Sequence, residues 1–198
     1  MHTPKKSLLV SMAERYDMEV AQFANTIKNT CMPKDSTDEQ FAAFLMVARE
    51  YNLNPLTREI HAFPGKGGGI QTITGIDGWA KIMNSHPQFN GLSFEFERGD
   101  NGELIAVKAI IHRKDRDHPV EVTEYMSECR GATEPWKKWP ARMLRHKAMI
   151  QCCRLAFGFT NIIDPDEYDR RQQAEYIDVT PEPSTVSNLN EKLKAPAA

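Results

Sequence analysis

Apolar and polar positions follow two different periods along the chain. In residues 41–51 (FAAFLMVAREY) the apolar side chains recur every three or four positions, which predicts one buried face of a helix. In residues 92–98 (LSFEFER), 104–113 (LIAVKAIIHR) and 120–126 (VEVTEYM) they alternate or run continuously, and turn residues separate the three segments. The second pattern predicts a three-stranded antiparallel meander.

Helix signals dominate the chain before Pro55. Residues 7–31 predict one or two short helices. Ser36 and Glu39 predict a capping box for the helix that follows, because their side chains can satisfy free backbone N–H groups. That helix is expected to end by Asn54, since a residue before proline avoids the helical conformation.

A β-hairpin and another helix are expected next. Residues 58–63 (REIHAF) and 70–74 (IQTIT) flank the turn PGKGGG, whose glycines accept positive φ angles. Asp77 then predicts the N-cap of a helix over residues 78–86. The strands therefore fall into two antiparallel groups, the hairpin and the meander.

The last third of the chain is predicted to be helical and then polar. Pro140 can start, and Gly158 can end, the longest helix. Asp164 begins a shorter acidic helix, and the composition of residues 179–198 is typical of a disordered tail. We expect an α+β fold, with one folded domain over residues 1–178 and a polar tail over 179–198.

Charge and hydropathy limit the possible partners. The 198 residues are 40% hydrophobic and 26% charged, and the formal net charge is −2, so an anionic partner requires a local basic patch. No window approaches the ~18 to 20 apolar residues of a membrane span. The N-terminal segment also lacks the apolar region of a signal peptide, so we expect an intracellular protein that binds no membrane.

Metal chemistry finds little support in the sequence. The four cysteines and six histidines show no zinc-binding spacing, and we expect buried, reduced thiols. A metal-dependent nuclease centred on four acids is disfavoured, because exposed strand positions and a helix cap explain them: Glu59, Asp77, Glu95 and Glu97.

The helix predicted over residues 140–158 has an unusual charge pattern. Its four fixed cations have no acidic neighbour within the helix: Arg142, Arg145, Lys147 and Arg154. At about 100° per residue, Lys147, Gln151 and Arg154 share one stripe of an otherwise apolar surface. Arg142, Arg145 and His146 form a second stripe in the first turns. Burying an unpaired cation costs several kcal/mol, so something negative is expected to meet them.

Two interpretations account for these charges. In the first, carboxylates from elsewhere, such as the acidic segment 164–169, pair with the cations. In the second, nucleic-acid phosphates meet them. From Arg130 to Arg154 seven basic residues and one acid give a charge of +6, and two tryptophans lie within, as is typical of a nucleic-acid groove. Composition alone leaves both interpretations open.

The tryptophans and the glycine-rich turn are also candidates for DNA contacts. Trp136 and Trp139 could stack bases, or they could belong to the core or to a subunit contact. The turn lacks the spacing of an ATP-binding loop, so it is first a hairpin turn. Arg58 and Lys66 could nevertheless reach a phosphate backbone.

Four segments resemble, in order, the phage Bet (Red-beta) single-strand annealing recombinases of the RecT superfamily. They are YNLNPLTREIHAFPGKGGG, GIDGWAKIMN, HRKDRDHPVEVTEYMSECR and PWKKWPARMLRHKAMIQCCRLAFGF. The resemblance implies a Rad52-like annealing core, in which a short β-meander and a β-hairpin are braced by helices. Trp139 and Ala141 stand where the best-known member has polar or basic residues.

The resemblance also implies a function. Such proteins bind single-stranded DNA and anneal complementary strands in homologous recombination without ATP, beside a 5′-to-3′ exonuclease. We therefore expect no enzymatic activity and no cofactor, with Mg²⁺ at most modulating annealing. The implied partners are single-stranded DNA, the annealed duplex intermediate, further copies of the chain in a ring or helical filament, the exonuclease and a host single-strand-binding protein. The implied location is the cytoplasm of a bacterial host, and the alternative function is protection of single strands without annealing.

The expected DNA-binding residues lie in the hairpin, the long helix and the segment before it: Arg58, Lys66, Trp136, Lys137, Arg142, Arg145, His146, Lys147 and Arg154. By resemblance, Lys147 and Arg154 grip the strand backbone, and Trp136 matches a family tryptophan. Arg142 and Arg145 match too, and face either DNA or a neighbouring subunit. The central expectation is that phosphates, and not internal carboxylates, neutralise Lys147 and Arg154.

Overall fold

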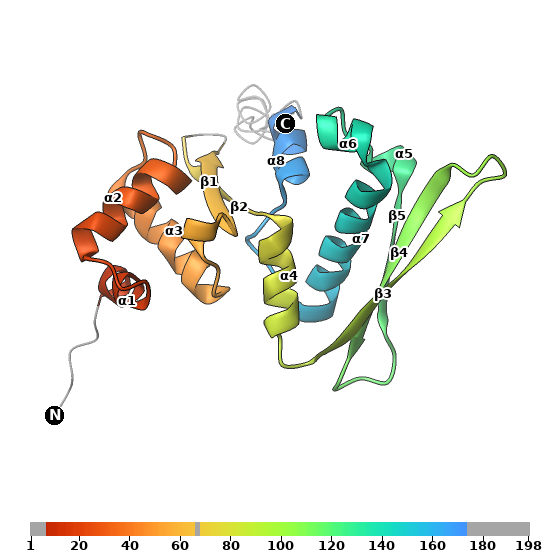
Figure 1. Ribbon diagram of the computed structural model, residues 1–198, viewed down its shortest axis with the longest axis horizontal. Coiled ribbons are helices and arrows are strands. Elements are labelled where there is room, and N and C mark those ends of the chain that lie inside the picture. Colours follow the sequence, from red (N-terminus) through yellow and green to blue (C-terminus); the bar gives the residue numbers. More distant parts are fainter. Residues whose placement is uncertain (1–6, 66–67, 174–198) are drawn as a thin grey trace, which may run out of the picture.

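A long helix packed on an antiparallel sheet forms one half of the molecule (Figure 1). This computed structural model describes residues 7–65 and 68–173, so Lys66 and the predicted tail lie outside the described residues. The sheet has the order β3-β4-β5, and α7 contacts β4 and β5. Its elements are β3 (Phe89–Arg98), β4 (Leu104–Arg113), β5 (Val120–Tyr125) and α7 (Pro140–Phe157). The predicted meander and long helix are confirmed.

Helix α7 is held on the sheet by apolar side chains. Val107, Ala109 and Ile111 alternate along β4 and have no exposed surface, as expected for positions on one face of a strand. The buried Cys152 of α7 lies over this sheet, with its Sγ 3.2 Å from the carbonyl oxygen of Val120. Helix α7 ends at Gly158, whose φ of 71° is the left-handed conformation predicted for a C-terminal glycine.

The hairpin precedes the sheet and leads directly into a helix. Strands β1 (Ile60–Pro64) and β2 (Ile70–Thr74) pair antiparallel, and α4 (Ile76–Ser85) follows. The N-cap of α4 is Gly75, so the prediction of Asp77 as the cap is wrong. The carbonyl of Gly75 already accepts a hydrogen bond from the Trp79 N–H, which places Asp77 inside the first turn.

Three helices form the N-terminal part of the molecule, at the other end of Figure 1 from the meander. They are α1 (Leu8–Arg15), α2 (Val20–Cys31) and α3 (Asp38–Glu50), and a 3₁₀ turn, η1 (Pro55–Thr57), follows. The capping box of α3 uses Thr37 and Gln40, one position later than predicted. Ser36 lies instead in the turn before the helix, where its N–H and its hydroxyl both donate to the Pro33 carbonyl, at 3.2 and 2.7 Å.

Short helices complete the fold. Between the meander and α7 lie α5 (Met126–Cys129) and α6 (Glu134–Lys138), and the predicted acidic helix is α8 (Pro165–Gln173). Helix α8 connects the hairpin with the part of the molecule that contains the meander. Its Tyr168 donates to the Pro64 carbonyl of β1, and its Arg170 donates to the Cys129 carbonyl of α5. The α+β prediction is confirmed, whereas the likeness to a Rad52-type core stays a prediction.

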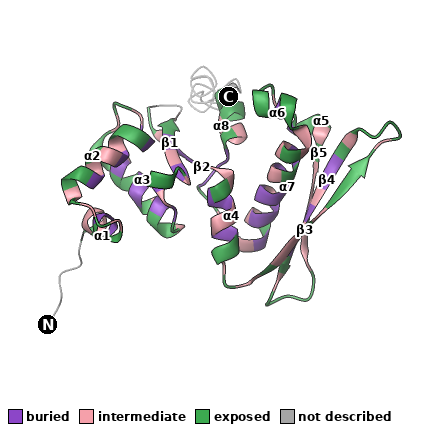
Figure 2. Ribbon diagram, viewed as in Figure 1, coloured by how far each residue is buried: buried purple, intermediate pink, exposed green. Residues whose placement is uncertain are grey.

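Burial is concentrated along α7, α4 and the inner faces of α2 and α3 (Figure 2). All four cysteines are free and buried, and burial raises the pKa of Cys153 to about 12.

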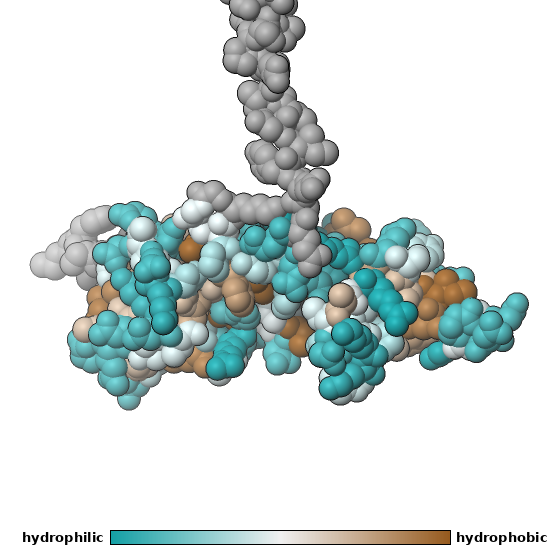
Figure 3. All heavy atoms as spheres, turned by 90° about the horizontal axis from the view of Figure 1, so that it is seen from above, coloured by the Kyte–Doolittle hydropathy of each residue, from teal (hydrophilic) through white to brown (hydrophobic). Residues whose placement is uncertain are grey.

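The face in Figure 3 is mostly hydrophilic, with smaller hydrophobic areas between. Among the described helices, including α7 with 18 residues, none combines the length and the apolarity that a bilayer span requires.

Candidate nucleic-acid interface

Lys147 is buried and paired with carboxylates at the start of α8. Its Nζ lies 2.8 and 2.9 Å from the two side-chain oxygens of Asp164, and 3.8 Å from Asp166. The Lys147 and Asp164 side chains are only 5% and 3% exposed. The expectation that no internal carboxylate neutralises this cation is therefore wrong, and the interpretation that invoked the acidic segment is correct for Lys147.

Arg154 is paired in the same way, one turn further along α8. Its Nη2 donates to Oε2 of Glu167 at 2.6 Å and to the Ile162 carbonyl at 2.8 Å. Gln151, the third member of the predicted stripe, donates to Glu167 at 3.1 Å. The stripe thus exists as the helical period requires, but the N-terminal turn of α8 covers it. The expectation for Arg154 is also wrong, because an internal carboxylate neutralises it.

The contact with Arg154 lowers the pKa of the Glu167 carboxyl. Burial favours its neutral form, but the hydrogen bonds and charge of Arg154, with the charge of Lys147, outweigh burial and lower the pKa of Glu167 below its ordinary value of 4.5. A carboxyl with a lowered folded-state pKa contributes stability above its unfolded pKa and loses it as the pH falls through the folded value.

Acidification is therefore expected to loosen α8 from α7. As the pH falls below 4.5, protonation of Glu167 removes the Arg154 ion pair, and the backbone amides of α8 should exchange hydrogen faster relative to those of β4. Hydrogen exchange measured between pH 6 and 3 checks this result. In Glu167→Gln the part of this pH dependence that Glu167 causes should disappear, and an unchanged pH profile in that variant would contradict the assignment.

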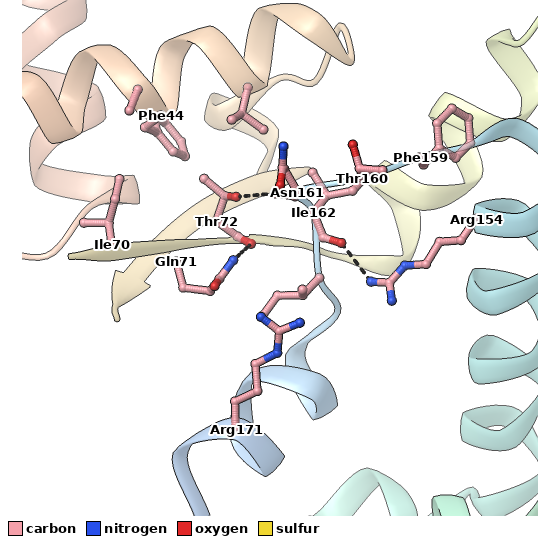
Figure 4. Close-up of a pocket in the computed structure, with 13 residues that line it drawn as sticks. Phe44, Ile70, Gln71, Thr72, Arg154, Phe159, Thr160, Asn161, Ile162 and Arg171 are labelled. Atoms are coloured by element: carbon pink, nitrogen blue, oxygen red, sulfur yellow. Dashed lines mark hydrogen bonds between the residues drawn. The ribbon is translucent and has the colours of Figure 1, made fainter. Parts of the chain in front are cut away.

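Both paired cations nevertheless border open cavities. Arg154 lines a cavity of about 480 Å³ beside α3, β2 and residues 159–163. Figure 4 shows Arg171 extending from α8 towards this same opening. Lys147 lines a second cavity, also of about 480 Å³, between the start of α7 and α8. A ligand that displaced α8 would therefore reach both cations.

Two members of the second predicted stripe, in the first turns of α7, are exposed arginines, whereas His146 is half-buried. The Arg142 guanidinium lies 5.1 Å from the ring centre of Trp139, and that of Arg145 lies 5.8 Å from the ring centre of Phe94. Within the described part of the chain neither arginine has a carboxylate partner. Stacking on a ring leaves the guanidinium charge available to an anion, so phosphate can reach both of these cations directly.

The start of α7 itself favours an anion. The helix has no acidic residue in its first turn and no side-chain cap, and Pro140 occupies its first position. Unsatisfied N–H groups and the helix dipole make this end positive, which disfavours nearby cations unless a negative group joins them. The positive end of α7 therefore repels the Arg142 guanidinium, and a bound phosphate would offset this repulsion.

Two lysines extend this positive surface along α6. Lys137 and Lys138 are 63% and 61% exposed and share one partner, Glu134, at 3.1 and 3.8 Å. Exposed pairs of this kind contribute about 0 to 1 kcal/mol, so they hold the lysines only weakly. We call the exposed residues of this surface the α6–α7 patch: Lys137, Lys138, Trp139, Arg142 and Arg145.

His146 and Arg58 lie outside this patch. Burial lowers the pKa of His146, and the charges of Arg145 and Arg142 lower it further against the opposing charge of Asp77. This lowered pKa reduces the charge that His146 adds to the patch at neutral pH. Arg58 is exposed at the end of η1 and borders a separate cavity with residues of the hairpin.

The two neighbouring tryptophans have opposite environments. Trp136 has no exposed surface, and its Nε1 finds no hydrogen-bond partner within residues 7–65 and 68–173. It is a core residue, so the expectation that Trp136 contacts DNA does not hold in this structure. Trp139 is 49% exposed. The sequence offered both roles for each residue, and only packing separated them.

In the described ranges no three side chains of His, Cys, Asp or Glu converge as metal ligands.

Two comparisons with known proteins show to which family the chain belongs. The RecT family model matches residues 17–180, which include the hairpin, the meander, α7 and α8. The Recombination protein bet of Escherichia phage lambda is 45% identical over 183 residues, a match that covers 86% of this chain and 68% of that protein. The chain therefore belongs to the RecT family.

Proposed function

We propose that this chain binds single-stranded DNA on the α6–α7 patch and promotes the pairing of complementary strands without ATP. The observation that carries the proposal is the exposure of Arg142 and Arg145 on a RecT-family fold, with no carboxylate partner for either among the described residues. Contacts from cations to phosphates release counterions and supply affinity that does not depend on sequence. Base pairing then supplies the specificity.

Annealing of this kind requires no bond chemistry. A strand whose phosphates lie on the patch keeps its bases free to test a second strand, and the neutralised phosphates repel that strand less. Matched base pairs are favoured by stacking at roughly 1.4 kcal/mol per step. Further copies of the chain, arranged in a ring or a filament, would keep the first strand in register and add avidity.

In this proposal, Lys147 and Arg154 contact DNA only if their carboxylate partners are first displaced. Because the Lys147 side chain is 5% exposed, a phosphate can meet it only after Asp164 is displaced. Arg154 is 21% exposed, but both carboxylate oxygens of Glu167 already accept from its guanidinium, so a phosphate would have to displace Glu167 to take these hydrogen bonds. The DNA contacts that the family resemblance implies for these two residues stay predictions, and they require α8 to leave α7.

The proposed partners follow from the family. We propose a 5′-to-3′ exonuclease that exposes the strands, and a host single-strand-binding protein that covers them first. No cofactor is assigned, and Mg²⁺ would act only by screening phosphates during annealing. These partners are supported by the match to a phage recombination protein.

Mixing two complementary labelled oligonucleotides tests the function directly. We expect the chain to speed duplex formation, measured by energy transfer between the labels, and ATP to leave the rate unchanged. A protein that only protects single strands would slow pairing, and that result would favour the alternative function. Incubating labelled DNA with Mg²⁺ and the chain should leave its length unchanged on a gel, whereas shortened products would indicate a nuclease.

A further inference from the structure

Trp139 is the exposed member of the three tryptophans of the chain. Trp79 and Trp136 have no exposed surface, whereas Trp139 is 49% exposed at the N-cap of α7. A large aromatic ring that stays in water forgoes the stabilisation it would gain in the core. Its exposure, in the middle of a cationic patch, is therefore a feature that the fold alone does not explain.

The surroundings of Trp139 fit a flat ring with polar edges. Trp139 lines the cavity of about 480 Å³ whose floor includes the apolar side chains of Ile76, Met143 and Ile150. The cavity lies within the size range of small-molecule sites, and its interior is mainly apolar. An aromatic base could stack on the indole there while its edge groups remain available for hydrogen bonds.

The charges around the cavity favour different positions for a base and for its phosphate. Arg142 stands on the Trp139 side, with its guanidinium 5.1 Å from the ring centre. Asp166 and Asp169 stand on the α8 side of the same cavity, and Lys147, which also lines it, is neutralised by Asp164. Carboxylates repel a phosphate, but they accept hydrogen bonds from the N–H groups on base edges, which thymine also carries at N3. The phosphate is thus favoured at the arginine rim and the base inside.

The geometry points to a stacking site in which Trp139, braced by Arg142, holds one base of the bound single strand. This inference rests on the proposed function and deepens it, since it names the part of the DNA that the patch recognises besides phosphate. A strand anchored in this way keeps a fixed register on each copy of the chain. Stacking of one base on an aromatic side chain is expected to strengthen binding by about tenfold.

Intrinsic fluorescence is a direct test, because the other two tryptophans are buried. Oligothymidylate should quench the emission of the wild type, and an abasic oligonucleotide of equal length, which keeps the phosphates, should bind with little quenching. In Trp139→Phe the quenching should vanish while part of the affinity remains. Trp139→Ala should bind oligothymidylate about tenfold more weakly and the abasic strand as before.

A matched variant separates stacking from charge. Lys138→Ala should weaken binding of both oligonucleotides by the same factor, because it removes a charge that attracts phosphate and leaves the aromatic ring of Trp139 in place. Melting temperatures of all variants should equal that of the wild type, since Trp139 and Lys138 are both exposed.

Each other outcome has a distinct meaning. If the wild type binds neither oligonucleotide, the proposed function itself fails. If it binds both and Trp139→Ala discriminates between them as the wild type does, DNA binding stands and the stacking site is overturned. If the emission of Trp139 changes with protein concentration in the absence of DNA, and oligothymidylate adds no quenching, the ring belongs to a contact between copies and the inference is equally overturned.

Discussion

Lys147→Ala should lower the free energy of unfolding by about 3 to 5 kcal/mol. The substitution leaves the Asp164 carboxylate, which is 3% exposed, without the ammonium group that lies 2.8 Å away. An uncompensated buried charge is among the most destabilising single changes, and the whole stability of a domain is about 5 to 15 kcal/mol. Urea unfolding followed by circular dichroism measures the loss.

The control for this prediction removes both charges together. Asp164 also caps α8, because its Oδ1 accepts hydrogen bonds from the N–H groups of Asp166 and Glu167. Asparagine caps helices about as well as aspartate, so Lys147→Met combined with Asp164→Asn keeps the cap and should recover most of the lost stability. Lys138→Ala removes an exposed lysine and should change stability by less than about 1 kcal/mol. Wild-type stability of Lys147→Ala would refute the buried ion pair.

The same double variant decides what Lys147 does for DNA. If Lys147 only holds α8 in place, the stabilised Lys147→Met/Asp164→Asn chain should bind oligonucleotides like the wild type. If phosphates displace Asp164 and reach Lys147, the double variant should bind more weakly despite its native stability. Single substitutions cannot make this distinction, because unfolding and loss of contact both reduce binding.

Replacing Arg142 and Arg145 together by alanine should weaken the binding of single-stranded DNA by at least about tenfold at moderate salt. Both guanidinium groups are exposed and lie on aromatic rings rather than carboxylates. The loss should be equal for oligonucleotides of unrelated sequence, because phosphates carry no sequence information. The slope of log affinity against log salt should also fall in magnitude by about 0.7 for each phosphate contact removed. Fluorescence anisotropy at several salt concentrations measures both quantities.

A matched control guards against a general effect of lost charge. Arg49→Ala removes an exposed arginine from α3, in the N-terminal helices, and should leave affinity and salt slope nearly unchanged. If the double variant at positions 142 and 145 binds DNA like the wild type, the patch is not the DNA surface. A reduced assembly size of that variant in light scattering would then assign both arginines to a contact between copies.

The secondary structure could be predicted from the sequence because its causes are local. The spacing of apolar residues placed the meander and α7, and glycine at position 158 ended α7 because left-handed backbone costs glycine little. Caps were less predictable. The hydroxyls of Ser36 and Thr37 are chemically alike, and a turn that engages Ser36 with Pro33 decided between them.

The candidate site could be predicted only in part. The helical period put Lys147 and Arg154 on one stripe, and the resemblance marked the region as a DNA-binding surface, but neither says what lies across from a side chain. Trp136 and Trp139 differ by three positions and have the same chemistry, yet one is in the core and the other is in water.

The sequence by itself determined the elements of this protein, its family and the supply of positive charge along α7. Tertiary structure alone decided which of those charges are free. The chain turns after Gly158, Ile163 forms a bridge beside Ile73 of β2, and α8 returns across α7 with Asp164 and Glu167 facing its cations. Local periodicity fixes the direction of a side chain on its own helix, but its electrostatic partner depends on a separate segment brought there by folding.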